Sequence, residues 1–312
     1  MPAGDPALCI YEVGPRDGLQ NEPETVATEH KLALIDGLAR AGLRRIEVGS
    51  FVSPKWIPQL ADAEALTAAL PPHPGVRYSA LVPNLKGYER LRAAGGGVSV
   101  AAVFLSASET HNRKNVNCSI AEGLERVAPV AERARADGLG LRAYVSTVCG
   151  CPYEGEVAPA AVVSLTRRLL ELGATEISLG DTIGVGHPRQ VQALVRAVAG
   201  EAPLERIALH LHDTFGRALA NVQAGYEAGV RTFDASLGGL GGCPYAPGAS
   251  GNVATEDVVD LFERAGIATG IDQGRLVDTT HWLERDVLKR PLPGRVYRAR
   301  LGERRRRQEG QA

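Results

Sequence analysis

Short apolar runs rich in β-branched residues alternate with longer amphipathic stretches along most of the chain. Eight such runs follow one another, at 8–13, 45–48, 76–81, 98–104, 141–148, 176–179, 207–212 and 232–235. Each precedes a stretch whose apolar residues recur at helical spacing. Strict alternation of strands and helices predicts right-handed crossovers and a parallel sheet. Eight units in about 260 residues favour an α/β fold of the (β/α)8 TIM barrel type, with an open sheet and a cap domain as the alternative.

Several predicted helices carry residues that start or stop a helix. A glycine suited to a left-handed cap follows five of them, at Gly42, Gly95, Gly138, Gly173 and Gly229. Thr28 and Ser119 each open an amphipathic stretch, so we expect them to be N-caps. These boundaries agree with the eight-unit pattern.

The end of the chain differs in composition from the rest. From Pro291 onward apolar residues are few, and four arginines stand in succession at 304–307. We therefore assign residues 1–290 to one catalytic barrel domain with C-terminal helices. Residues 291–312 are expected to be a flexible, Arg-rich extension that contacts water.

Composition narrows the class of protein. A hydrophobic content of 44% and a charged content of 23% over 312 residues are typical of a globular protein with a large core. A net charge of -1 gives no general attraction to nucleic acid or to anionic membranes. Five cysteines, an odd number, do not indicate a disulfide framework, and no apolar run approaches the roughly 20 residues of a membrane span. We expect a cytoplasmic protein that binds neither nucleic acid nor membranes.

Reactive side chains gather where the predicted strands end. In a TIM barrel the active site lies at this end of the strands. Arg16 and Asp17 follow the first run, Glu47 lies in the second, Asp181 follows the sixth, His210 and His212 close the seventh, and Cys243 follows the eighth. The barrel would bring all seven side chains to one mouth.

The two histidines at 210 and 212 suggest a metal site. Side chains alternate along a strand, so His210 and His212 point to the same side. Asp17 can add a carboxylate oxygen, and Asn252 can add an amide oxygen just before the last helix of the barrel. Mixed nitrogen and oxygen ligation with open positions favours Mg²⁺ or Mn²⁺ over zinc. Such a cation would chelate a hydroxy or keto acid and promote carbon–carbon cleavage.

Further residues are candidates for the chemistry. Cys243 follows the glycine-rich run 238–242, which suggests unusual backbone angles or a close ligand around a reactive thiol. Arg16 supplies a permanent positive charge for an enolate or carboxylate oxygen. Glu47 and Asp181 fit acid/base roles, or equally the role of bracing Arg16 or a histidine. The pair Cys149 and Cys151 is expected to be a spectator of the metal site.

Several long blocks resemble one family. The segments 12–22, 50–56, 150–155, 178–186 and the Cys243 loop are similar, in register and order, to the 3-hydroxy-3-methylglutaryl-CoA lyases. The resemblance covers about residues 11–270. It implies a metal-dependent barrel enzyme that cleaves 3-hydroxy-3-methylglutaryl-CoA to acetyl-CoA and acetoacetate, as in leucine degradation.

Roles follow from this resemblance position by position. Asp17, His210, His212 and Asn252 match the metal ligands. Arg16 matches the residue that steadies the thioester enolate, and Cys243 matches the thiol that protonates the departing carbanion. Glu47 and Asp181 match acidic residues of the proton transfers. Gln20 and Asn84 are candidate substrate-binding residues, and the loop 113–115 also resembles family segments.

The expected partners are an acyl-CoA substrate and a second copy of the chain in a homodimer. Three alternatives keep part of this interpretation. A lyase for a longer or differently branched 3-hydroxyglutaryl-CoA would retain every residue named above. A Claisen-type synthase usually has an additional C-terminal region, which the short Arg-rich end does not supply. A barrel that binds metal or acyl-CoA without catalysis is disfavoured by the full set of ligands, arginine and thiol.

Overall fold

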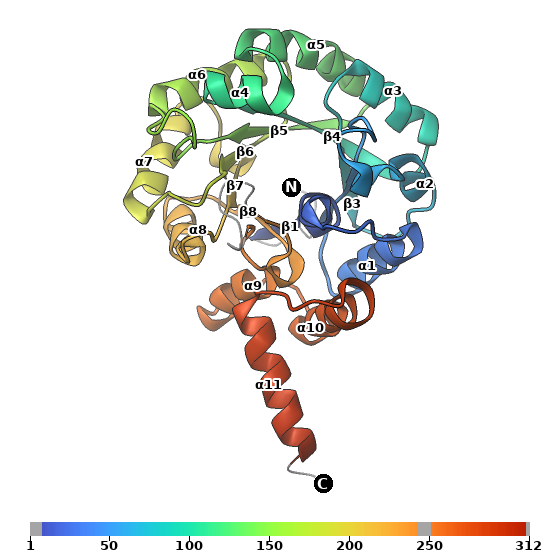
Figure 1. The fold of residues 1–312 in the computed structure, drawn as a ribbon. Coiled ribbons are helices and arrows are strands. Elements are labelled where there is room, and N and C mark those ends of the chain that lie inside the picture. The colour runs from blue at the N-terminus through green and yellow to red at the C-terminus, as the bar shows by residue number, and fades with distance from the viewer. Residues whose placement is uncertain (1–7, 243–250, 310–312) are drawn as a thin grey trace.

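Eight parallel strands close into a barrel in the computed structural model, which describes residues 8–242 and 251–309. Each strand pairs with the next, and the first pairs with the last, as Figure 1 shows along the barrel axis. The strands are β1 Cys9–Glu12, β2 Arg45–Ser50, β3 Arg77–Leu81, β4 Val98–Ser106, β5 Gly140–Ser146, β6 Glu176–Asp181, β7 Ile207–Leu211 and β8 Thr232–Ala235. All eight predicted runs overlap these strands, and the predicted TIM barrel is confirmed.

Helices surround the barrel and cover the outer faces of its strands (Figure 1). Their bounds are α1 Thr28–Arg40, α2 Ala63–Ala68, α3 Leu85–Ala94, α4 Glu109–Val116, α5 Ile120–Ala136, α6 Pro159–Glu171, α7 Pro188–Val198, α8 Ala218–Glu227, α9 Thr255–Arg264, α10 Gln273–Trp282 and α11 Arg295–Glu309. Helix α7 illustrates the packing, because Val191, Leu194, Val195 and Val198 are all buried at helical spacing. One large apolar core between strands and helices results.

The predicted helix boundaries hold at six of seven positions. All five glycines named above have positive φ, from 70° at Gly95 to 106° at Gly42. Ser119 caps α5 in a reciprocal arrangement with Glu122. The prediction for Thr28 is wrong by one residue, because α1 begins at Thr28 and its N-cap is Ala27. The Thr28 hydroxyl instead donates to Asp62 Oδ2 at 2.7 Å and so ties α1 to the segment before α2.

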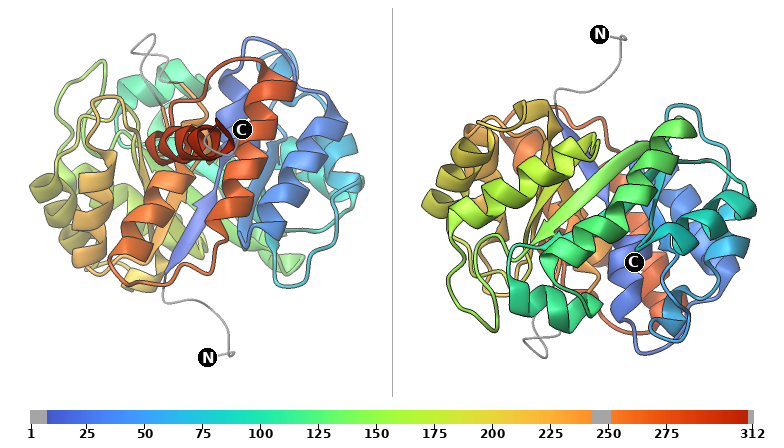
Figure 2. Two further views of the ribbon diagram at one scale, coloured as in Figure 1. Left: turned by 90° about the horizontal axis from the view of Figure 1, so that it is seen from below. Right: turned by 90° about the horizontal axis from the view of Figure 1, so that it is seen from above.

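The Arg-rich end is more regular than expected. Residues Arg295–Glu309 form α11, which projects from the barrel beside α9 in Figure 1 and is seen nearly end-on in the left view of Figure 2. Asp257 accepts hydrogen bonds from the first backbone amides of α11, and Tyr297 and Leu301 bury one face of its first half. Arginine, leucine and glutamate favour helix, so local propensity and this anchor order the segment. The domain boundary at residue 290 stays a prediction.

Candidate active site

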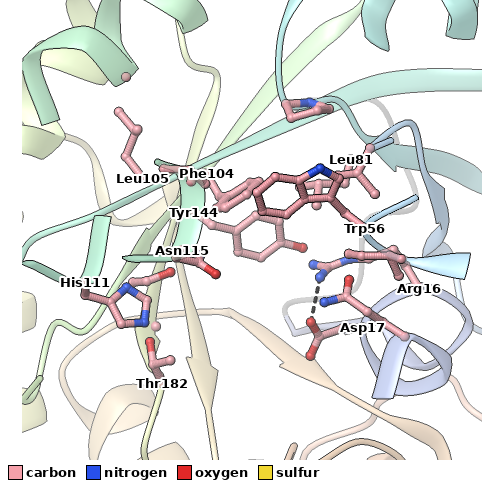
Figure 3. A pocket seen from close by; sticks show the side chains of 18 of the residues that line it. Arg16, Asp17, Trp56, Leu81, Phe104, Leu105, His111, Asn115, Tyr144 and Thr182 are labelled. Carbon is pink, nitrogen blue, oxygen red and sulfur yellow. Dashed lines mark hydrogen bonds and ion pairs between the residues drawn. The ribbon is translucent and has the colours of Figure 1, made fainter. Parts of the chain in front are cut away.

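A cavity of about 560 Å³ opens at the carboxyl ends of the strands. Arg16 and Asp17 line it from the turn after β1, and His210 and His212 line it from the end of β7. Figure 3 shows Trp56 and His111 on opposite sides of this cavity, with Tyr144 between them. The strand ends therefore bring these four predicted residues together where a barrel enzyme acts, whereas Glu47 and Asp181 do not line the cavity.

A helical turn positions Arg16 and Asp17. Residues Gly14–Gly18 follow β1 directly, and the Arg16 guanidinium points into the cavity (Figure 3). Its Nη1 donates to Asp17 Oδ1 and its Nε donates to Glu47 Oε2, each at 2.5 Å. The Tyr144 hydroxyl also donates to Glu47 Oε2, at 3.1 Å. Fully buried Glu47 thus braces Arg16, which was one of its two expected roles.

The pKa values of these two carboxyls shift in opposite directions. Burial alone would raise the pKa of Asp17, but Arg16 and the two histidines lower it to about 2. Burial raises the pKa of Glu47, and Arg16 opposes that shift only in part. Asp17 is therefore ionised at neutral pH, as an oxygen ligand of a cation must be.

Asp17, His210 and His212 form a cluster suited to a metal ion. One ligand atom from each lies within 4.8 Å of the others. Among the described residues this is the group with that geometry. Buried Nδ1 of His212 has no hydrogen-bond partner there. Burial and neighbouring His210 lower the pKa of His212 to about 4, so its imidazole is neutral at pH 7. The donor set fits a divalent cation.

Asn252 lies next to the cluster, in the segment before α9. It forms an antiparallel bridge with His212, and its Nδ2 donates to Asp17 Oδ2 at 2.8 Å. The predicted proximity is correct, although the amide nitrogen rather than the oxygen faces Asp17. Amide nitrogen and oxygen exchange places by rotation of the side chain, so the residue can offer either atom.

Sequence reasoning missed the residue that orients His210. Asp234 in β8 is buried, and its Oδ2 lies 3.2 Å from His210 Nδ1. Arg142 Nη2 donates to Asp234 Oδ1 at 2.6 Å, and the Ser178 hydroxyl donates to Oδ2 at 2.9 Å. Burial would raise the pKa of Asp234, but Arg142 and His210 lower it. A carboxylate on the far nitrogen of a ligating histidine is the usual support of a metal site.

Comparison with known proteins decides the family. The profile described as HMGL-like matches residues 7–283. A 3-hydroxy-3-isohexenylglutaryl-CoA/hydroxymethylglutaryl-CoA lyase of Pseudomonas aeruginosa is 52% identical over 269 residues, which cover 86% of this chain and 89% of that protein. The chain belongs to the hydroxymethylglutaryl-CoA lyase family. It is a carbon–carbon lyase, as the sequence predicted.

Solved structures of hydroxymethylglutaryl-CoA lyases share the fold throughout. The crystal structure of the Pseudomonas aeruginosa lyase matches with a TM-score of 0.92 at 48% identity, covering 96% of this chain and 99% of that one. A lyase from Acinetobacter baumannii, in complex with coenzyme A and 3-methylmalate, matches with a TM-score of 0.89 at 42% identity, covering 94% of each chain.

Of the other predicted site residues, Asp181 and Asn84 have local hydrogen-bond partners in this lyase fold. Asp181 is buried and accepts hydrogen bonds from the backbone amides of Val185 and Gly186, at 3.1 and 2.8 Å, so it orders the loop after β6. Asn84 caps α3 by accepting from the Gly87 amide at 3.0 Å, while also lining the cavity. Gln20 lines the cavity beside Asp17.

The glycine-rich run is described only up to its last glycine. Gly238, Gly239 and Gly241 have φ values of 62°, 71° and 125°, which confirms the predicted need for unusual backbone angles. Cys243 itself lies outside the described residues. Cys149 and Cys151 are buried free thiols, and no metal-binding group among residues 8–242 and 251–309 includes them. No described helix has the length and apolar character needed to cross a membrane.

Proposed function

We propose that this chain cleaves 3-hydroxy-3-methylglutaryl-CoA to acetyl-CoA and acetoacetate with Mg²⁺ or Mn²⁺. The observation that carries the proposal is the cluster of Asp17, His210 and His212 beside Arg16 in one cavity. The Acinetobacter baumannii relative was solved with coenzyme A, which supports an acyl-CoA ligand here. Leucine degradation is the pathway that this reaction serves in the family that the chain resembles.

Asp17, His210, His212 and Asn252 would hold the cation, which polarises the substrate's oxygens when bound. Arg16 lies beside this cluster with its guanidinium fixed by Glu47. It is therefore placed to stabilise the negative charge that develops on the thioester oxygen as the carbon–carbon bond breaks. A fixed donor of this kind contributes about 10²- to 10³-fold to kcat.

Two proton transfers balance the reaction. A base takes the proton of the C3 hydroxyl, the bond from C3 to the thioester methylene breaks, and the methylene carbanion takes a proton. We assign the donor of that second proton to the Cys243 thiol, on the family resemblance. Oε2 of Glu47 holds Arg16 and Tyr144, whereas its buried Oε1 has no hydrogen-bond partner among the described residues. This free oxygen makes Glu47 a better candidate base than Asp181, whose two oxygens hold loop amides.

The test is an assay of the purified protein with 3-hydroxy-3-methylglutaryl-CoA and Mg²⁺ or Mn²⁺ under reducing conditions. We expect equal amounts of acetoacetate and acetyl-CoA, and loss of turnover on chelation. A Cys243→Ala variant should bind the cation normally and turn over far more slowly. Full activity of Cys243→Ala would remove the thiol from the mechanism, and inactivity of the wild type would reject the proposed substrate.

A longer substrate is the second candidate. The Pseudomonas aeruginosa relative is named for both an isohexenyl and a methyl substrate. Apolar side chains of Leu81, Phe104 and Leu105 line the cavity here, so an apolar substituent at C3 has matching surface. Comparing kcat/KM for both acyl-CoA substrates in one assay decides which is preferred.

We also propose a cytoplasmic homodimer. Free thiols at Cys9, Cys118, Cys149 and Cys151 suit a reducing compartment. The dimer rests on the family resemblance alone. Sedimentation of the purified chain would measure its mass, and a single species at the monomer mass of 33.0 kDa would contradict the proposed dimer.

A further inference from the structure

A buried carboxylate near the site binds three separate chain segments. Glu12, the last residue of β1, has no exposed surface. Its Oε1 accepts hydrogen bonds from the backbone amides of Gly14 and Leu237, at 2.8 and 2.9 Å. Its Oε2 accepts from the Thr255 hydroxyl at 2.7 Å. One side chain thus joins positions that are 225 and 243 residues apart from it in sequence.

Two of these three segments carry proposed metal ligands. Gly14 opens the helical turn that holds Asp17, and Thr255 opens α9 three residues after Asn252. Leu237 begins the turn that follows β8. Asp17 and Asn252 also contact each other directly, at 2.8 Å. The Glu12 carboxylate supports that contact through the Gly14 backbone amide on one side and the Thr255 hydroxyl on the other.

The contact between Glu12 and Gly14 is tight. A Cβ atom at Gly14 would lie 2.5 Å from Glu12 Oε1, closer than real Cβ contacts allow. A side chain at residue 14 would therefore displace the Glu12 carboxylate from its present position. Burial also raises the pKa of Glu12 to about 7, which shows that burying its negative charge is unfavourable at this position. An apolar side chain of similar size would fill the space but would leave two amides and a hydroxyl unpaired.

Glu256 provides an internal comparison. It is equally buried and accepts hydrogen bonds from the Gly238 amide, at 2.8 Å, and from the Thr280 hydroxyl of α10. Glu256 itself lies in α9, and its hydroxyl partner Thr280 ties α9 to the outer helix α10. The hydroxyl partner of Glu12, Thr255, instead ties β1 to the start of α9 beside Asn252. Both acids are buried and both accept hydrogen bonds from an amide and a threonine hydroxyl, but they connect different segments of the chain.

We propose that Glu12 is a positioning residue that fixes Asp17 and Asn252 relative to each other for the divalent cation. The inference rests on the proposed metal site. Glu12 touches neither the cation cluster nor the cavity, so it acts through the turn Gly14–Gly18 and the start of α9. Loss of its hydrogen bonds should loosen two ligands at once.

Two isosteric substitutions separate positioning from general stability. Thr255→Val removes the hydroxyl that donates to Glu12, and Thr280→Val removes the hydroxyl that donates to Glu256. Both threonines are fully buried, so the two variants should lose comparable stability. Only Thr255→Val should weaken binding of Mn²⁺, measured by electron paramagnetic resonance without substrate. We expect about a tenfold or larger rise in its Kd, as for other supports of metal ligands.

Hydrogen exchange of the metal-free protein provides a second readout. Thr255→Val should speed exchange of amides in residues 14–18 and 252–255, and Thr280→Val should leave them as in the wild type. If the wild type binds no Mn²⁺, the proposed cofactor fails and this exchange comparison alone decides the positioning role. Equal exchange and equal Mn²⁺ affinity in the two variants would overturn it.

Substitution of Glu12 itself gives the rescue test. Glu12→Gln keeps an acceptor oxygen for the two amides and can donate to Thr255 Oγ1, so its Mn²⁺ affinity should stay within about threefold of the wild type. Glu12→Met fills similar volume without an acceptor and should bind Mn²⁺ as weakly as Thr255→Val or more weakly. Failure of Glu12→Gln to outperform Glu12→Met would contradict hydrogen-bonded positioning.

Discussion

Replacing Asp234 with alanine tests how buried ion pairs inside the barrel support His210. Asp234 is the closest carboxylate to Arg142, whose side chain is 1% exposed. Among the described residues, Glu176 is the second anionic partner of Arg142, at 3.0 Å from Nε. Removing one member of a buried ion pair costs about 3–5 kcal/mol. Because Glu176 remains, we expect the free energy of unfolding to fall by about 3 kcal/mol. The same substitution removes the partner of His210 Nδ1, so Mn²⁺ affinity should fall about 10- to 100-fold.

Both effects can be measured on one preparation. Urea unfolding without metal gives the stability loss, and a Mn²⁺ titration gives the affinity. Ser178→Ala is the matched control, because it removes a neutral hydrogen bond to the same Asp234 oxygen and should cost about 1 kcal/mol with unchanged Mn²⁺ affinity. Should Asp234→Ala fail to fold, Asp234→Asn keeps the shape and removes the charge. Wild-type Mn²⁺ affinity in a folded Asp234 variant would refute the view that this carboxylate orients His210.

Three further predictions follow from the site, the buried acids and the helix caps. Arg16→Lys should lower kcat about 10²- to 10³-fold with a smaller change in KM, as measured by steady-state kinetics. A lysine ammonium lacks the planar set of donors with which the Arg16 guanidinium binds Glu47 and faces the cavity at the same time. Burial raises the pKa of Glu256 from 4.5 to about 7, so the folded state binds this proton more tightly than the unfolded chain. Its contribution to stability is present below pH 4.5 and is lost as pH rises through 7, by about 3 kcal/mol, and Glu256→Gln should flatten urea-derived stability over that range. Ser119→Ala removes the cap shared with Glu122 and should cost about 1 kcal/mol in thermal unfolding, with kcat unchanged.

Local patterns in the sequence were sufficient to predict the barrel. Each strand of a parallel barrel is covered by helices outside, so its apolar run stands out from the amphipathic stretch that follows. Positive φ at Gly42 and Gly229 shows that single glycines marked helix ends correctly. Thr28 was misplaced because a threonine at a helix start fits both the cap and the first turn. The segment Arg295–Glu309 was missed because Asp257, which anchors α11, lies far away in sequence.

Residues of the site were predictable to the extent that strand polarity determines position. Arg16 and Asp17 follow β1, His210 and His212 lie at the end of β7, and all four line one cavity, as the barrel requires. Roles were harder to predict than positions. A carboxyl at a strand end, such as Asp181, can face a substrate or accept loop amides, and only the path of the following loop decides between them.

Charged residues inside the strands were the signal that sequence reasoning passed over. Glu12, Arg142 and Asp234 each lie in an otherwise largely apolar strand, and burying such groups is costly unless each finds a partner. Arg142 lies in β5 and Asp234 in β8, which are not neighbours in the sheet, so their contact crosses the inside of the barrel. Closure of the barrel therefore creates this pair, and no two-strand pattern contains it. When a barrel is predicted, a charged residue within one strand should therefore be compared with oppositely charged residues on non-adjacent strands. Here that comparison would have paired Arg142 with Asp234, and Asp234 in turn contacts His210 of the site.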